Sequence, residues 1–85
     1  MLKISKIKFT KEEAKKIGDK INVNWDKIDI DEFFMGMNVE LEHGTVDSQT
    51  NVTNDDPVMT GKIALIHIKE LPDYYTRLKK MEKQK

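Results

Sequence analysis

Helix start and stop signals recur along this chain and restrict its fold more than any other feature. Thr10 and Glu13 have the spacing of a capping box, in which each side chain accepts a hydrogen bond from the other residue's backbone N–H. Phe9 precedes the cap and is expected to pack on Ala14 as a hydrophobic staple. Apolar residues then recur at helical spacing until Gly18 weakens the run. These signals predict a first helix that begins directly after Thr10.

Two further helices are predicted in the middle of the chain. The second begins near Asp29 or Asp31, and Gly44 is placed to end it with a left-handed cap. Asp56 and Pro57 predict the start of the third helix, because aspartate is a favoured N-cap and proline is favoured at the first helical position.

A fourth helix is predicted after the break at residues 71–73, where Leu-Pro-Asp interrupts the third. Its inward side is expected to carry Tyr74, Tyr75, Leu78 and Met81. The fold class predicted is all-α, a compact bundle of about four short helices over residues 10–85. Residues 1–9 form an N-terminal arm before it, which can include a short extended segment.

One predicted connection, the polar loop of residues 44–56, is long for so small a domain. Its Asp and Asn side chains suggest a calcium site, but the glycine and the closing glutamate of an EF-hand loop are absent. Because the same residue types also form turns without an ion, calcium is not the favoured interpretation.

Composition limits what such a bundle can do. The chain has 85 residues and no cysteine, which excludes a disulfide framework and a thiolate metal site. Residues 1–9 lack the continuous apolar stretch of a signal peptide, and no segment approaches the ~20 apolar residues that cross a bilayer. We therefore expect a cytoplasmic protein with no membrane role. The core of so short a chain is small, which favours a binding module over an enzyme.

The charges are sorted along the chain, although the net charge is zero. Lysine and arginine dominate residues 1–20 and 76–85, whereas acids dominate residues 21–75. This pattern predicts that the basic ends pack on the acidic middle, with a basic patch for an anionic partner as the alternative. No nucleic-acid-binding signature accompanies the lysines, so the expected partner is another protein. The expected oligomeric state is a monomer or a weak homodimer.

Two pairs of a carboxylate and an imidazole do not fit a plain apolar bundle. Glu40 and His43 are three residues apart in the second predicted helix, and His67 and Glu70 are three apart in the third. Each pair therefore shares a helix face. We expect all four side chains to face one another in the interior, between antiparallel helices. Glycines at two further positions, 36 and 61, are expected to allow the two helices to approach closely.

Three interpretations of these four residues stay open. In a hydrogen-bonded network each imidazole bonds a carboxylate of the facing helix, and no ion is needed. Alternatively, Glu40, His43, His67 and Glu70 hold one divalent metal ion of the zinc or iron class. A metal-dependent enzyme that uses the same residues, with the polar loop over the site, is the third and least favoured. A dinuclear centre is disfavoured. Di-iron bundles contain Glu-x-x-His twice in the same order, whereas this chain has it once and has the reversed order, His-x-x-Glu, once.

Three segments resemble a known family of small domains. They are Met35–Gly44, which contains Glu-Leu-Glu-His, Thr53–Pro57, and Gly61–Tyr75, which ends in His-x-x-Glu-x-Pro-Asp-Tyr-Tyr. Over about residues 10–82 the chain is similar to bacterial and phage domains of unknown function. The resemblance implies a stand-alone accessory protein or a module of a larger one. It implies no activity, and it places the four polar residues within the family motif.

Overall fold

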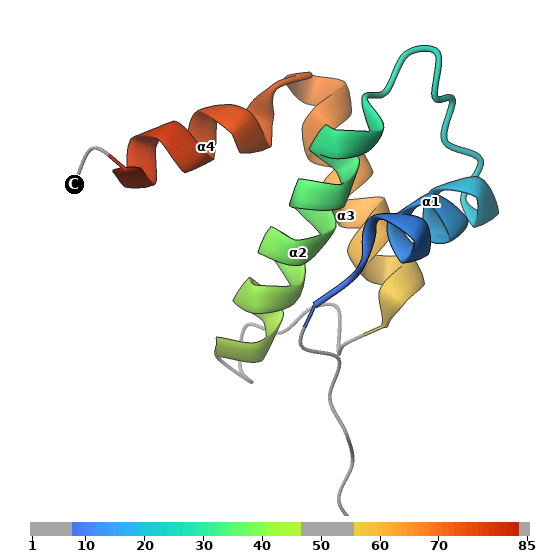
Figure 1. The fold of residues 1–85 in the computed structure, drawn as a ribbon, viewed down its shortest axis with the longest axis horizontal. Coiled ribbons are helices and arrows are strands. Elements are labelled where there is room, and N and C mark those ends of the chain that lie inside the picture. The colour runs from blue at the N-terminus through green and yellow to red at the C-terminus, as the bar shows by residue number, and fades with distance from the viewer. Residues whose placement is uncertain (1–7, 47–55, 84–85) are drawn as a thin grey trace, which may run out of the picture.

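Four α-helices make up most of the computed structural model, which describes residues 8–46 and 56–83 (Figure 1). They are α1 (Lys11–Lys20), α2 (Ile30–Val46), α3 (Pro57–Glu70) and α4 (Tyr74–Lys83). The two described ranges contain no strand, and the all-α prediction is confirmed. None of these helices is long and apolar enough to cross a bilayer.

α2 lies at the centre of the arrangement and contacts each of the other helices. It runs antiparallel to α3, and α1 packs beside both (Figure 1). α4 contacts α2 and α3 near its start and then extends away from the other three helices (Figure 1). The last helix therefore diverges from α2 instead of packing along it.

Local side-chain caps start three of the helices as the sequence predicts. The Thr10 hydroxyl accepts a hydrogen bond from the Glu13 N–H at 3.1 Å, and Glu13 Oε1 accepts one from the Thr10 N–H at 2.9 Å. Asp29 Oδ1 accepts from the Asp31 N–H at 2.8 Å at the start of α2. Asp56 Oδ1 accepts at 2.9 Å from the backbone N–H two residues later. Each cap satisfies N–H groups that lack a partner within their own helix.

The end of α1 is a left-handed turn at Asn22, whose φ is 64°. The N–H groups of Asn22 and of the next residue donate to carbonyls of the last helical turn, which is the Schellman pattern. This turn leads to Trp25, whose Nε1 donates to Asp19 Oδ1 at 2.7 Å. The indole meets Phe33 edge-on, with 5.6 Å between ring centroids, and so closes one end of the core.

The end of α2 differs from the prediction. The sequence predicts a left-handed cap at Gly44, but α2 continues to Val46, and no glycine in the described ranges has a positive φ. A glycine inside a helix costs only about 1 kcal/mol relative to alanine, which neighbouring residues can outweigh. The polar loop predicted at residues 44–56 is the segment whose composition suggests a calcium site. Its Asp and Asn residues within 47–55 lie outside the described part, and Asp56 serves as the cap of α3.

The core is built on one face of α2. Phe33, Met37 and Leu41 are four residues apart and are fully buried against Ala64 and Ile68 of α3. Residues at this spacing share a helix face, which explains why they point to one side.

α4 sends one side chain into this core, Tyr75, which is fully buried. Leu78 and Tyr74 are partly buried against the core, but the prediction that Met81 points inward is wrong. Met81 is 66% exposed, because α4 has already left the body of the protein at that point.

Gly36 and Gly61 admit side chains of other helices. A Cβ at Gly36 would clash with the ring of Tyr75 from α4, and one at Gly61 would lie 2.8 Å from Ile17 Cγ2 of α1. The sequence predicts that these glycines bring α2 and α3 together. Their closest neighbours instead belong to α4 and α1.

Candidate functional site

A polar cluster joins α2, α3 and α4 around the hydroxyl of Tyr75. This hydroxyl donates a hydrogen bond to Glu40 Oε2 at 2.7 Å and lies 2.9 Å from His67 Nδ1. His67 Nδ1 is also 3.2 Å from Glu40 Oε2. We call these three residues, Glu40, His67 and Tyr75, the Tyr75 cluster. It joins one side chain from each of the three helices.

The proton positions in the Tyr75 cluster follow from its donors and acceptors. The hydroxyl of Tyr75 has one proton, which it gives to the Glu40 carboxylate. His67 Nδ1 faces the tyrosine oxygen and the carboxylate, so it must carry a proton and donate it. In the neutral ring this leaves Nε2 as an acceptor.

The imidazole of His67 lies at the edge of the cluster. Its side chain is 33% exposed, whereas that of Glu40 is 13% exposed. The ring of Tyr74 stacks on it, with 4.6 Å between centroids and 13° between planes. The ring is therefore held in one orientation by a stack on one side and two polar partners at Nδ1.

The environment of the Tyr75 hydroxyl keeps it protonated. Burial raises the pKa of Tyr75 well above its ordinary value, because the phenolate would lose its hydration. The hydrogen bond to Glu40 and the negative charge of that carboxylate raise the pKa of Tyr75 further. The hydroxyl therefore keeps its proton and donates it to Glu40, which holds α4 against α2.

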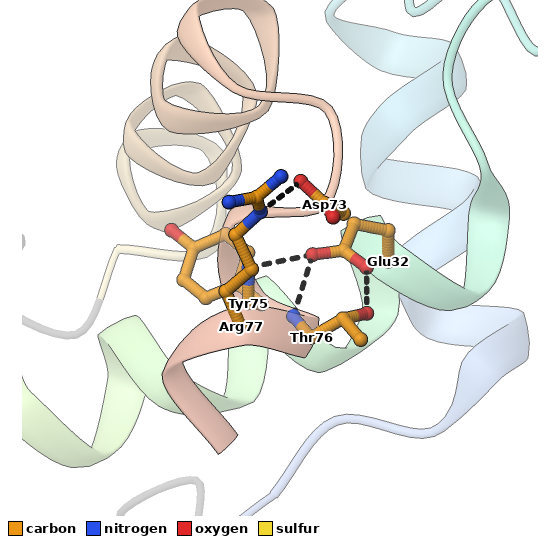
Figure 2. A network of polar contacts seen from close by, with 5 residues as sticks. All are labelled: Glu32, Asp73, Tyr75, Thr76 and Arg77. Carbon is orange, nitrogen blue, oxygen red and sulfur yellow. Dashed lines mark hydrogen bonds and ion pairs between the residues drawn. The ribbon is translucent and has the colours of Figure 1, made fainter. Parts of the chain in front are cut away.

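A second polar contact fixes the start of α4, and it comes from Glu32 on α2 (Figure 2). Glu32 is 5% exposed, and its Oε2 accepts from the backbone N–H groups of Tyr75 at 2.6 Å and Thr76 at 3.0 Å. Its Oε1 accepts from the Thr76 hydroxyl at 2.5 Å. A carboxylate at this point also interacts favourably with the positive end of the helix dipole.

An ion pair on the outside of α4 lies next to this cap. Arg77 Nε donates to Asp73 Oδ1 at 2.8 Å, one helical turn apart, as Figure 2 shows. Both side chains are more than half exposed, so the pair contributes less than about 1 kcal/mol. The buried Glu32 carboxylate is the stronger determinant of where α4 starts.

The structure brings together two of the four polar residues that the sequence singles out. Glu40 and His67 meet, but Glu70 is exposed, and the prediction that it points into the interior is wrong. The side chain of His43 lies outside the described part, so its place in the set stays a prediction. Among the side chains that are described, no three of His, Asp or Glu gather as metal ligands.

The antiparallel direction of α2 and α3 explains why Glu70 is separate. His43 follows Glu40 toward the end of α2, whereas Glu70 follows His67 toward the opposite end of the pair. At a rise of 1.5 Å per residue, three residues move each backbone position about 4.5 Å along its axis. When Glu40 and His67 lie at the same height along the two helices, the backbone positions of His43 and Glu70 are therefore displaced in opposite directions.

The functional residue that sequence analysis misses is Glu32. Its partners are 43 and 44 residues away along the chain, so no local spacing identifies it. Tyr75 is predicted to point inward, but its contact with Glu40 and His67 is equally non-local. In the sequence Glu32 stands next to Asp31 in the first turn of α2, where acidic residues are common, so nothing local distinguishes it.

An apolar groove of about 530 Å³ lies between α2 and α4, next to the Tyr75 cluster. Its lining positions follow helical spacing on both walls, at 34, 35, 38, 39 and 42 of α2 and at 75, 78, 79 and 82 of α4. Phe34, Met35, Val39 and Leu78 supply its apolar surface, and charged residues of both signs form its rim. α2 and α4, the two helices that line this groove, diverge from each other (Figure 1).

Comparison with known proteins identifies a family to which this chain is similar. A family model described as "Protein of unknown function (DUF5661)" matches residues 14–84. No curated protein and no solved structure matches the chain. The matched range contains Glu32, the Tyr75 cluster and both helices of the groove. The predicted resemblance to a domain family of unknown function is confirmed.

Replacing Glu32 by glutamine tests the cap of α4. The variant keeps the shape of the side chain but removes its charge, so we expect a loss of about 1–3 kcal/mol in the free energy of unfolding. Asp31→Asn is the matched control, because the side chain of Asp31 is exposed and, among the residues that the structure describes, pairs with Lys11 at the surface. Its effect should stay within about 1 kcal/mol. Equal losses in urea denaturation of the two variants would contradict the assigned role of Glu32.

The raised pKa of Tyr75 predicts a loss of stability at alkaline pH. Above pH ~10 the unfolded chain loses this proton while the folded chain keeps it, so rising pH favours unfolding. Relative to Tyr75→Phe, the free energy of unfolding of the wild type should fall by up to about 1.4 kcal/mol per pH unit. Urea denaturation of both proteins at several alkaline pH values measures the difference, and parallel curves would show that the hydroxyl is not held as described.

Proposed function

The chain belongs to this family of proteins of unknown function, and we propose that it is a small accessory domain that binds another protein through the α2–α4 groove. The observation that carries the proposal is a groove between α2 and α4 whose α2 wall is largely apolar and whose α4 wall contributes Leu78, with buried polar contacts at the start of α4. No catalytic step is part of it. The role of the domain is recognition.

The shape of the groove supports a helical ligand. Phe34, Met35 and Val39 place apolar side chains along the α2 wall at helical spacing, and Leu78 lies on the α4 wall. A cleft of this kind fits the apolar face of a third helix. Its volume of about 530 Å³ has room for several side chains of such a ligand. The rim carries Lys8 and Lys79 together with Glu82, which can pair with charges of the ligand and set its direction.

The Tyr75 cluster and Glu32 contribute to this function by position. Together they attach the first turn of α4 to α2 and α3, at both the backbone and the Tyr75 side chain. The groove is then formed before the ligand arrives, which lowers the entropy cost of binding. Of the predicted clamp of Glu40, His43, His67 and Glu70, only Glu40 and His67 meet, and Tyr75 of α4 joins them. Glu70 is exposed, and the side chain of His43 lies outside the described part.

A second candidate function is binding of one divalent metal ion. It is favoured by the tautomer of His67, in which the neutral ring carries its proton on Nδ1 and leaves the lone pair of Nε2 free. Its Nδ1 is bonded to Glu40, which leaves Nε2 available, and metal-bound histidines commonly have such a carboxylate behind them. In this proposal His67 is a ligand of zinc or iron, Glu40 orients it, and His43 and Glu70 are the remaining candidates. A metal-dependent enzyme would use the same ion. Elemental analysis of the purified protein, wild type against His67→Ala, tests it: equal metal content would remove this candidate.

Selection from a phage-displayed random peptide library tests the binding function. Peptides enriched on the wild type should have apolar residues at helical spacing, and they should lose at least about tenfold in affinity for Val39→Glu. Leu78→Gln is a milder second variant on the opposite wall. Ile66→Glu, at a 55% exposed position of α3 outside the groove, is the control and should bind as the wild type does.

Circular dichroism melting of each variant shows whether it is folded, so that a loss of binding can be assigned to the groove. Peptides that bind Val39→Glu and Leu78→Gln as tightly as the wild type would contradict the proposed function. The absence of any enriched peptide would contradict it as well.

A further inference from the structure

A second cavity, of about 470 Å³, lies between the connection from α1 to α2 and the last two turns of α3. Both segments are at the top of the view in Figure 1. The floor of the cavity continues the apolar core, with Val23 and Ile28 from the connection and Leu65 and Ile68 from α3. Its volume is within the range of small-molecule sites.

Hydrogen bonds within the connection give this wall of the cavity a fixed shape. The Val23 N–H donates to the Gly18 carbonyl at 2.8 Å, at the end of α1. Farther along the chain, the Asn24 carbonyl accepts from the N–H groups of Lys27 at 3.0 Å and Ile28 at 2.9 Å. The wall is therefore formed without a ligand, which lowers the entropy cost of binding one.

The polar side chains at the edge of the cavity are rich in hydrogen-bond donors. Lys27 comes from the connection and Lys69 from α3, and an ammonium group can only donate. Both lysines are exposed, and neither is in an ion pair with a residue that the structure describes.

The amide of Asn24 adds another donor to this edge. Its Oδ1 already accepts from the Asp26 N–H at 3.0 Å, so its NH2 group is the part left to bond a ligand. Asn22, the other lining amide, can donate or accept. The described residues that line the cavity include no aspartate or glutamate. An apolar floor is thus combined with a positive edge that carries no carboxylate.

We propose that this cavity, the lysine cavity, binds a small carboxylic acid with an apolar body, such as a medium-chain fatty acid. A carboxylate only accepts hydrogen bonds, which matches the donors of Lys27, Lys69 and Asn24. The apolar body covers the floor at Leu65 and Ile68 and so removes apolar surface from water. Free phosphate does not fit, because it has no apolar part, and a divalent cation would be repelled by two ammonium groups.

The lysine cavity and the α2–α4 groove share no lining residue. A ligand of the cavity is therefore an addition to the proposed binding of a protein partner, and a variant of one site leaves the lining of the other unchanged.

NMR titration of the full-length chain with octanoate, below the concentration at which it forms micelles, tests the site. We expect saturating shifts of the backbone amides within residues 21–28 and 65–69. Octanol, which has the apolar body but no charge, should bind at least about tenfold more weakly.

The double variant Lys27→Glu with Lys69→Glu should also weaken octanoate binding at least about tenfold, because two carboxylates would then face the ligand's own. Lys16→Glu with Lys62→Glu is the control, since it changes the net charge equally at exposed positions outside the cavity. Circular dichroism melting shows that both double variants are folded. Any one of three results would overturn the assignment: amides of these residues that do not shift, octanol that binds as tightly as octanoate, or equal affinities in the two double variants.

Discussion

The arrangement of this protein depends on one buried carboxylate, Glu32, which supplies the N-terminal cap of a helix far from it in sequence. α4 has ten residues, and so short a helix is marginal by itself in water. Glu32 binds two of its free N–H groups and a threonine hydroxyl. A buried carboxylate without such partners would be strongly destabilising, so the cap and the buried position of Glu32 require each other.

Tyr75 determines how α4 is turned once its start is fixed. The ring packs against Gly36, where even a methyl group would clash, and the hydroxyl bonds Glu40 and meets His67. Glu32 holds the backbone of the first turn of α4, and Glu40 holds the side chain of Tyr75 in the same turn. Two such contacts restrict rotation as well as translation, and α4 therefore leaves the body at a set angle. The groove between α2 and α4 is a consequence of that angle.

The parts of the fold that the sequence predicts correctly are those set within one helical turn. The caps at Thr10 and Asp56 involve residues two or three positions away, so their spacing is visible in the sequence. Gly44 shows the limit of such signals, because α2 continues through it. A stop signal of about 1 kcal/mol does not decide where a helix ends when its neighbours favour continuing.

The candidate site is predicted in part for a related reason. Helical periodicity gives the face on which Glu40 and His67 lie, and these two residues do meet. Periodicity does not give the level at which two antiparallel helices meet, and Glu70 therefore ends up exposed. The contact of Glu32 with α4 depends on chain segments more than forty residues apart, which no spacing rule can connect.

The most direct test is the distance between α4 and the body of the protein, with and without the Glu32 carboxylate. The chain has no cysteine, so spin labels at Lys16→Cys on α1 and Lys80→Cys on α4, both exposed, report only this distance. Dilution with unlabelled protein removes any signal between copies. A single narrow distance distribution is predicted for the parent chain and a broad one after Glu32→Ala. Equally narrow distributions at the same distance in both proteins would contradict the claim that Glu32 sets the position of α4.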